Sequence, residues 1–264
     1  MERSTVDSIL RSTQAYCSQV CEKQTLDNGI AYYSERFADL PDANQFREVV
    51  LDDAAAIPEA FAQAQRWFQE RGLFCYRWVP AGGQPTDELA SFLKGQGFRT
   101  RPQTVMALTR WMDIQPVEGV RIHPARATRA VFQALFLSAG PGRRGADPAL
   151  IARLYEERLD DPQYDMFVAM VDRNPAACCA LYQVGDFARV MDLTVLDGYV
   201  DRHVDRALLA HVLAMAKRLA MRNIYLQIDS ADTDRIAWYE SFGFAADGDM
   251  VEFERDRPHD ADRR

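Results

Sequence analysis

The chain has 264 residues, of which 48% are hydrophobic, and a formal net charge of −8. This apolar content excludes a wholly disordered chain, and the length suits one large domain or two smaller lobes. The acidic balance argues against a nucleic-acid binder, and no stretch has the ~20 apolar residues that cross a bilayer. We therefore expect a globular protein with neither nucleic acid nor membrane as a partner.

The cysteines and the N-terminal residues favour a cytoplasmic location. The five cysteines are odd in number and lack the spacing of zinc ligands, so we expect no metal site. Cys17 and Cys21 are one helical turn apart, and Cys178 and Cys179 are adjacent, which is typical of small core residues in a reducing cytoplasm. The first residues have neither the basic start nor the apolar core of a signal peptide.

The first half of the chain alternates helices and strands. Apolar periodicity predicts helices over 4–22, 58–71 and 86–94, and strands over 30–37, 46–51, 73–79 and 101–111. Pro58 marks the start of the second helix, and Gly95 and Gly97 mark the end of the third. A linker follows at 113–118.

The second half continues this alternation. The pattern predicts strands over 119–123, 166–171, 176–184, 188–195 and 222–229, and helices over 128–137, 148–159 and 204–219. A last helix follows Ser230, a residue that can cap it, and ends at Gly243. A Gly185-Asp186 turn joins two of the strands as a hairpin.

The stretch from 187 to 244 resembles the GNAT (acyl-CoA N-acyltransferase) superfamily. It reads strand, long helix, strand and short helix, and it closes on Tyr239-Glu240-Ser241-Phe242-Gly243-Phe244. The resemblance covers about residues 119–254 and implies an α/β fold, with a twisted mixed sheet flanked by helices. It also implies an acetyl-CoA-dependent N-acyltransferase, in which a small-molecule or peptide amine attacks the thioester directly. A homodimer is compatible with it.

The first half repeats the order of the second. Residues 71–76 parallel 222–226, and residues 92–98 parallel 238–244, each ending in Gly-Phe. We expect a duplication, with a degenerate GNAT-like lobe over 1–112 and a GNAT acetyltransferase-like lobe over 119–254. The alternative is an unrelated α/β domain with a chance Gly-Phe.

The resemblance places the acetyl-CoA site between two strands and the following helix. The backbone of Leu193, Thr194 and Val195 would hold the pantetheine arm. The pyrophosphate would lie on the amides of the helix start, where the dipole is positive. The residues of that segment are Arg202, His203, Val204, Asp205 and Arg206.

The loop at this helix start departs from the family pattern. The family reads Gln/Arg-x-x-Gly-x-Gly/Ala, whereas Val200, His203 and Asp205 occupy those positions here. The Asp205 carboxylate would compete with a bound anion at the positive helix end. His203 could bind a phosphate when protonated, or be an ordinary residue of a helix start.

Tyr239 and Asp192 are the candidate catalytic residues. In the family, the tyrosine of this motif often protonates the departing CoA thiolate as a general acid. The alternative for Tyr239 is an aromatic core residue beneath Phe242 and Phe244. Asp192 could hold or deprotonate an amine, or point to solvent from its strand.

Residues 140–145 match Gly-x-Gly-x-x-Gly, but a helix precedes them, whereas a dinucleotide site needs a strand there. We expect a loop, in which Arg143 and Arg144 could hold an anionic acceptor or the CoA phosphate. Two functions remain open for the chain. The retained Tyr239 favours an N-acyltransferase, and the missing glycines favour a non-catalytic GNAT-fold binding or regulatory protein.

Overall fold

The computed structural model describes residues 5–51, 53–138 and 147–257. By its contacts the chain divides into two compact units. Unit 1 consists of Met1–Ser12, Val105–Ile228 and Asp232–Asp247, and unit 2 consists of Thr13–Thr104, Asp229–Ala231 and Gly248–Arg264. Two long strands, β5 (Arg99–Leu108) and β11 (Phe244–Glu254), contribute residues to both units. The lobes at 1–112 and 119–254 therefore remain a prediction.

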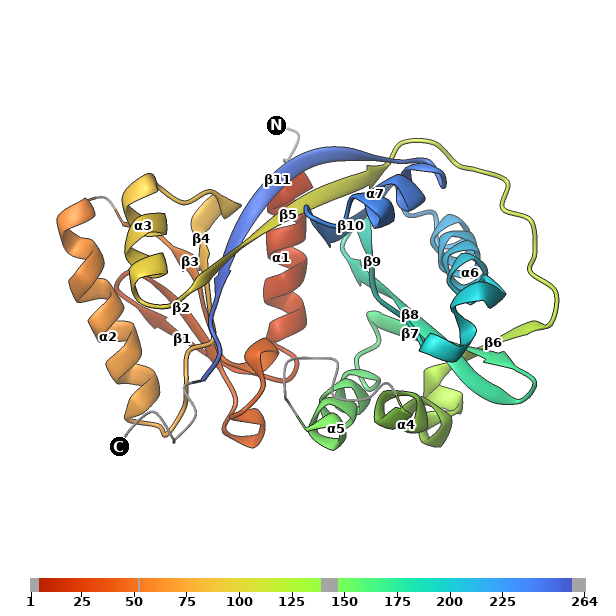
Figure 1. The fold of residues 1–264 in the computed structure, drawn as a ribbon, viewed down its shortest axis with the longest axis horizontal. Coiled ribbons are helices and arrows are strands. Elements are labelled where there is room, and N and C mark those ends of the chain that lie inside the picture. The colour runs from red at the N-terminus through yellow and green to blue at the C-terminus, as the bar shows by residue number, and fades with distance from the viewer. Residues whose placement is uncertain (1–4, 52, 139–146, 258–264) are drawn as a thin grey trace. The chain divides into compact units, whose positions relative to one another are not determined.

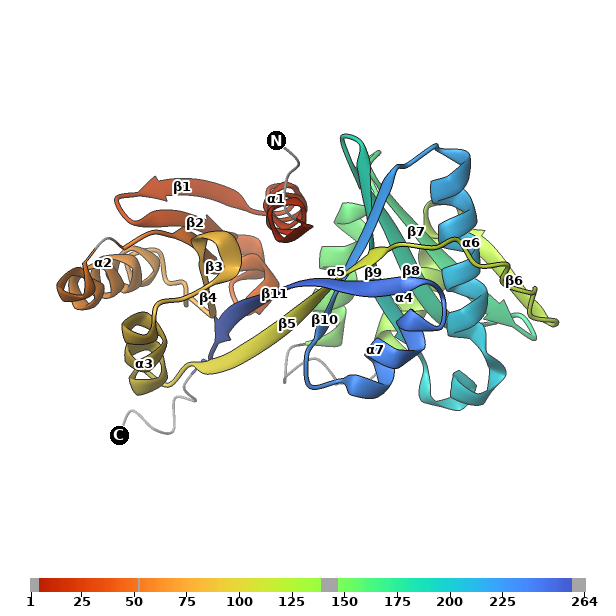
Figure 2. The same cartoon turned by 90° about the horizontal axis from the view of Figure 1, so that it is seen from above.

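Unit 2 is a mixed sheet with helices. Its strands are β1 (Glu22–Leu26), β2 (Gly29–Tyr33), β3 (Gln45–Val49) and β4 (Arg77–Pro80), followed in hydrogen-bonded order by β11. The pairs β1–β2 and β2–β3 are antiparallel, and β3 and β4 are parallel. Helices α2 (Ile57–Gln69) and α3 (Asp87–Gly95) lie side by side in Figure 1 and Figure 2. Helix α1 (Thr5–Cys17) is divided between the units: its residues up to Ser12 belong to unit 1, and those from Thr13 belong to unit 2.

The apolar core of unit 2 lies between its sheet and α2. The buried residues of this helix recur at helical spacing and form one face: Ile57, Ala60, Phe61, Ala64 and Phe68. Phe46 and Trp78 meet that face from neighbouring strands, with ring centroids 4.8 Å apart. Sequence periodicity predicts this helix correctly because its apolar stripe is the surface that it buries.

The other face of the same strands carries a buried ionic network. Arg47 lies 3.7 Å from Glu252, and Arg77 lies 3.7 Å from Glu252 and 3.2 Å from Glu254. Arg101 lies 3.0 Å from the same Glu254 carboxylate. Arg47 and Glu254 are each only 1% exposed. Burial of a charge is costly unless partners compensate it, so these side chains depend on one another.

Unit 1 has the larger sheet. Its strands run in the hydrogen-bonded order β11, β5, β10 (Asn223–Asp229), β9 (Phe187–Val195), β8 (Asn174–Val184), β7 (Tyr164–Val171) and β6 (Val120–Pro124). The pairs from β6 to β9 are antiparallel, and β9 and β10 are parallel. Gly185, with φ +64°, makes the tight turn of the predicted β8–β9 hairpin. A mixed sheet flanked by helices is therefore confirmed.

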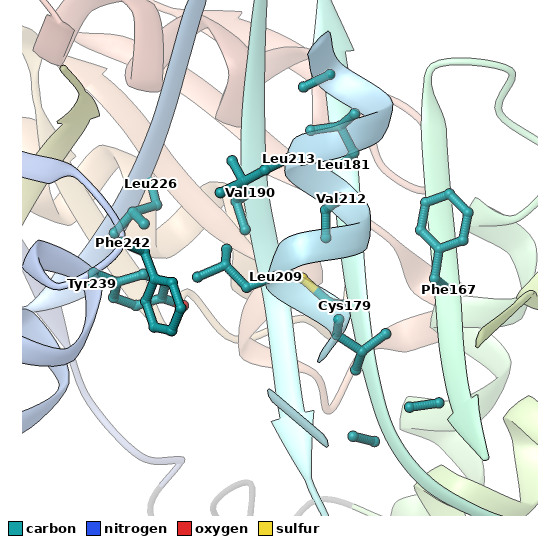
Figure 3. Close-up of a cluster of buried hydrophobic side chains, with 14 of the residues drawn as sticks. Phe167, Cys179, Leu181, Val190, Leu209, Val212, Leu213, Leu226, Tyr239 and Phe242 are labelled. Atoms are coloured by element: carbon teal, nitrogen blue, oxygen red, sulfur yellow. The ribbon is translucent and has the colours of Figure 1, made fainter. Parts of the chain in front are cut away.

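Helices cover both faces of this sheet (Figure 1). Helix α6 (Val204–Arg218) packs on one face, whereas α4 (Arg129–Ser138) and α5 (Pro148–Arg158) lie on the other. Figure 3 shows the core on the α6 side, where Leu209 and Val212 of the helix face Cys179 and Val190 of the strands. Since β7 and β8 are buried on both faces, they have nearly continuous apolar sequences.

The two halves of the sequence have matching local features. In each half a parallel strand pair, β3–β4 or β9–β10, is connected through a helix. The strand beside β10 is β5, from the first half, and the strand beside β4 is β11, from the second. Gly97 and Gly243 both have left-handed backbones, with φ +82° and +89°, before a buried phenylalanine.

Several element boundaries differ from those expected from the sequence. The first helix ends at Cys17 rather than at residue 22, and Glu22–Leu26 forms β1, whose mostly exposed side chains give no apolar pattern. The last helix, α7 (Thr233–Glu240), is capped by Asp232 and not by Ser230. The Asp232 carboxylate accepts a hydrogen bond from the Arg235 amide at 3.0 Å, whereas the Ser230 hydroxyl lies 2.9 Å from that of Thr104.

We expect His211 of α6 to make stability pH-dependent. Burial lowers the pKa of its imidazole below the ordinary value, and the charge of Arg218 lowers it further. The unfolded chain keeps a pKa of about 6.5, so it binds more protons than the folded chain once the pH falls through that value. The free energy of unfolding should therefore decrease from about pH 7.5 to about pH 5.5. Urea titrations at several pH values should show a weaker decrease of the free energy of unfolding in His211→Gln than in the native protein. The control is His123→Gln, an exposed site, which should keep the native dependence on pH. An equal pH dependence in all three proteins would contradict the role of His211.

Candidate active site

The parallel strands β9 and β10 diverge soon after they pair. Their residue pairs are Phe187 with Asn223, Ala188 with Ile224, and Arg189 with Tyr225. Both strands are described throughout, and they form no further pair with each other although β9 continues to Val195. Beyond Arg189, the edge of β9 that faces β10 is therefore outside the ladder, which leaves backbone N–H and C=O groups on that edge for another partner.

Leu193, Thr194 and Val195 lie on this diverging part of β9. Their other edge pairs with β8, as Thr194 with Cys178 and Val195 with Ala177. The three side chains are partly buried. The structure thus places the predicted pantetheine-binding backbone on a strand held from one side only.

Asp192 lies at a bulge in β9. The pairing with β8 shifts between Cys178 and Ala180, and Asp192 has the left-handed φ of +56°. An extra residue in a strand re-aims its side chain. The Asp192 carboxylate accepts hydrogen bonds from the hydroxyls of Tyr155, at 3.0 Å, and Tyr164, at 2.8 Å. Two phenol donors from α5 and β7 therefore hold this partly buried carboxylate in place.

A buried arginine belongs to the same cluster. Arg158, at the end of α5, is 1% exposed, and its guanidinium carbon lies 5.5 Å from the centre of the Tyr155 ring. Burial lowers the pKa of Arg158 to about 10, and the charge of Asp192 opposes this shift. Burial likewise raises the pKa of the Tyr164 hydroxyl well above its ordinary value, so the tyrosine remains a hydrogen-bond donor.

The start of α6 has a backbone that suits glycine. His203 precedes the helix with φ +52° and ψ +30°, and its side chain is exposed. Residues other than glycine rarely adopt this left-handed conformation. Val204, the first helical residue, is fully buried in the core, so its side chain points away from the helix end.

The side chains around this helix start are mostly engaged. Arg202 lies 3.9 Å from Asp172, and both are well exposed. The Asp205 carboxylate lies 3.0 Å from the guanidinium of Arg235 and also accepts a hydrogen bond from the Arg206 amide at 2.8 Å. Arg235 therefore offsets the negative charge that Asp205 places at the positive end of the helix.

Tyr239 is buried at the end of α7, beside the same arginine. Its ring and that of Phe244 have centroids 5.7 Å apart, and Figure 3 shows it next to Phe242 and Leu226. Burial raises the pKa of the Tyr239 phenol, while the positive charge of Arg235 acts in the opposite direction. A phenol that keeps its proton at neutral pH can serve as a proton donor.

Sequence reasoning missed Arg235, Tyr155 and Tyr164. Arg235 precedes Trp238 and Tyr239 by three and four residues, which is the spacing of neighbours on a helix, so its ring contacts had a sequence signal. Its ion pair with Asp205 had none, because the two residues are thirty positions apart. The Gly140–Gly145 motif, with Arg143 and Arg144, lies outside the described residues.

Comparisons with known proteins give one family model and several solved structures that resemble this chain. Residues 131–244 match the model of the Acetyltransferase (GNAT) family. A search of curated proteins gave no match. Among the part of the chain that the structure describes, no helix is both long and apolar enough to cross a membrane.

Solved structures share the fold over most of the chain. A GCN5-related N-acetyltransferase from Kribbella flavida has 15% identity and a TM-score of 0.69, with 99% of each chain covered. A functionally unknown conserved protein from Staphylococcus epidermidis has 15% identity and a TM-score of 0.67, covering 90% of this chain and 95% of that chain. A GCN5-related N-acetyltransferase from Sphaerobacter thermophilus has 16% identity and a TM-score of 0.61, covering 89% of this chain and 84% of that chain. At these identities the likeness shows the fold alone.

Proposed function

We propose that the segment matching the GNAT family is an acyl-CoA-dependent N-acyltransferase that acts on a small-molecule or peptide amine. The observation that carries the proposal is the divergence of β9 from β10 just before the start of α6. This arrangement offers unpaired strand backbone and a positive helix end close together in the sequence, as a long cofactor with a pyrophosphate requires.

Acetyl-CoA, as co-substrate, would supply the activated acyl group as a thioester. The backbone of Leu193 to Val195 would hydrogen-bond its pantetheine arm, and the amides at the start of α6 would bind its pyrophosphate. The left-handed backbone at His203 supports this role, because His203 stands where the family pattern has a glycine and a glycine readily adopts this conformation. The pairing of Asp205 with Arg235 removes part of the repulsion that a lone carboxylate would exert.

Two residues of the chain would serve the transfer itself. Asp192, fixed by two tyrosine hydroxyls, would bind the acceptor amine and take part in removing its proton. Tyr239 would protonate the departing thiolate, since its raised pKa keeps the phenol protonated at neutral pH. Both assignments are proposals from position and chemistry.

A calorimetric titration with acetyl-CoA, followed by a thiol-release assay with a panel of amines, tests this function. We expect saturable binding of acetyl-CoA in the micromolar range and amine-dependent release of CoA. Enzymes usually have KM values of about 1 μM–1 mM for their substrates. The absence of both binding heat and a thermal shift at millimolar acetyl-CoA would overturn the proposal.

A second candidate is a GNAT-fold protein that binds a partner without catalysis. The observation that favours it is the replacement of the loop glycines by residues with side chains, His203 and Asp205. On this model, native protein binds no acetyl-CoA, and the Asp205–Arg235 pair is purely structural. The same titration separates the two candidates.

His203→Gly should tighten acetyl-CoA binding by a few-fold without loss of stability. Glycine relieves a left-handed backbone that costs other residues roughly 1–2 kcal/mol, and it lets phosphate oxygens approach the amides. Ala220→Gly is a matched control, since Ala220 has a φ of +56° just beyond the other end of α6. It should gain similar stability and leave binding unchanged. Weaker binding by His203→Gly would show that the imidazole itself holds the phosphate.

We also propose that residues 1–112 are a degenerate copy of the acetyltransferase-like lobe at 119–254. The paired glycines at 97 and 243 and the reciprocal placement of β5 and β11 support a duplication. A cytoplasmic location is supported by the five cysteines, which are all buried thiols outside any disulfide. A homodimer remains a proposal that sedimentation can test.

A further inference from the structure

We propose that Arg235, oriented by Asp205, is a positioning residue that lies beside the Tyr239 ring and whose positive charge stabilises the tyrosinate formed when Tyr239 gives up its proton. This inference rests on the proposed acyl transfer and adds to it two residues that act through Tyr239.

The contacts of Arg235 fix its guanidinium in three directions. One nitrogen lies 3.0 Å from the Asp205 carboxylate at the start of α6. The guanidinium carbon lies 4.0 Å from the centre of the Trp238 ring and 5.3 Å from that of Tyr239. A planar guanidinium that stacks on a ring and pairs with a carboxylate has few orientations open to it, so its charge stays beside the Tyr239 ring.

This arrangement is partly withdrawn from solvent. The side chains of Arg235 and Asp205 are 28% and 19% exposed, and Tyr239 is 7% exposed. Charges in such surroundings interact more strongly than on an open surface. Burial raises the pKa of the Cys179 thiol well above its ordinary value, and the positive charge of Arg235 opposes that shift.

The charges explain why Tyr239 needs such a neighbour. Burial favours the neutral phenol and opposes formation of a tyrosinate. Arg235 acts in the other direction, since its positive charge lies beside the Tyr239 ring, 5.3 Å from the ring centre. Asp205 sets the orientation of Arg235 and offsets part of its charge. Arg235 therefore stabilises the tyrosinate less strongly than an unpaired guanidinium would, and the phenol can be restored.

The step balances as follows. The amine nitrogen forms a bond to the thioester carbonyl carbon, and the carbon–sulfur bond breaks with its electron pair on sulfur. The Tyr239 hydroxyl gives its proton to that sulfur, which yields CoA thiol and a tyrosinate beside Arg235. The proton lost by the amine nitrogen, passed through solvent, restores the phenol.

The test is a double-mutant cycle on turnover. Arg235→Gln should lower kcat about tenfold or more, because proton transfer as a whole contributes roughly 10²–10⁴-fold. In the Tyr239→Phe background the same change should have almost no further effect on kcat. Arg235→Lys keeps the charge and should recover part of the loss, and Asp205→Asn should lower kcat less than Arg235→Gln does. The exposed Arg222→Gln is the matched control and should behave as native protein.

A readout independent of activity accompanies the cycle. The Tyr239 ring carbon that bears the hydroxyl should change its NMR shift in Arg235→Gln, with Tyr239→Phe used to assign the signal. An unmoved signal, or equal losses of kcat in both backgrounds, overturns the positioning role while acyl transfer by the native protein stands. A native protein that binds acetyl-CoA but transfers nothing overturns the proposed function, and this inference with it.

Discussion

Replacing Tyr239 by phenylalanine should lower kcat about 10²–10⁴-fold, the usual contribution of a general acid or base. The substitution removes only the hydroxyl, and the ring keeps its packing against Phe242 and Phe244. Affinity for acetyl-CoA should change little, because the lost interaction is made mainly in the transition state. Steady-state kinetics with the best amine of the panel, together with calorimetry, measure both quantities.

Tyr76→Phe is the control for this experiment. Tyr76 is also a buried tyrosine, but it belongs to unit 2 and lies outside the proposed site. Its variant should keep native kcat. Equal activity of Tyr239→Phe and native protein would remove Tyr239 from the mechanism and leave it as a core aromatic residue, whereas a loss of acetyl-CoA binding would assign it to the cofactor site.

Glu254→Gln should lower the free energy of unfolding by about 3–5 kcal/mol, the cost of breaking a buried ion pair from one side. Glu254 is 1% exposed and lies 3.2 Å from Arg77 and 3.0 Å from Arg101. Its neutral replacement leaves two arginines with less compensation in a site that water hardly reaches. Glu252 compensates Arg77 in part, at 3.7 Å, so the loss should fall toward the lower limit. Chemical unfolding measures the effect.

The segment just after the end of β11 offers a matched control for Glu254→Gln. Asp256 lies 2.7 Å from Arg99, and these side chains are 62% and 66% exposed. Asp256→Asn removes the same kind of charge from a solvated pair, and such pairs contribute only about 0–1 kcal/mol. Similar losses in the two variants would show that solvent reaches the Glu254 network.

Much of the site follows from local sequence. The 3.6-residue spacing of Val204, Leu208 and Val212 predicts α6, and the structure buries all three. The strand, helix, strand and helix order leading to Gly243 predicts the family fold, which the match over 131–244 supports. Gly243 itself is required, since a Cβ atom there would lie 1.9 Å from the Arg110 carbonyl oxygen.

Other features depend on residues far apart in the chain. The bulge that re-aims Asp192 arises from its pairing with β8, and the two tyrosines that hold it come from α5 and β7. No short window of sequence contains these partners. The pairing of Asp205 with Arg235 is equally non-local. In the sequence alone the Asp205 carboxylate is unfavourable to anion binding, whereas in the structure Arg235 offsets part of its negative charge.

Apart from β11, the sequence by itself therefore determined the elements of the second half of the chain, the family that they resemble and the position of the helix start at His203. Periodicity and turn residues act over a few positions, so each window carries that information. Only the tertiary structure decided that β5 and β11 contribute to both units, that Arg235 compensates Asp205, and that charged residues of β3 and β11 form a buried network. These features depend on which strands pair and which side chains meet after burial, and the free energy of those contacts is set by desolvation and distance, which sequence spacing does not encode.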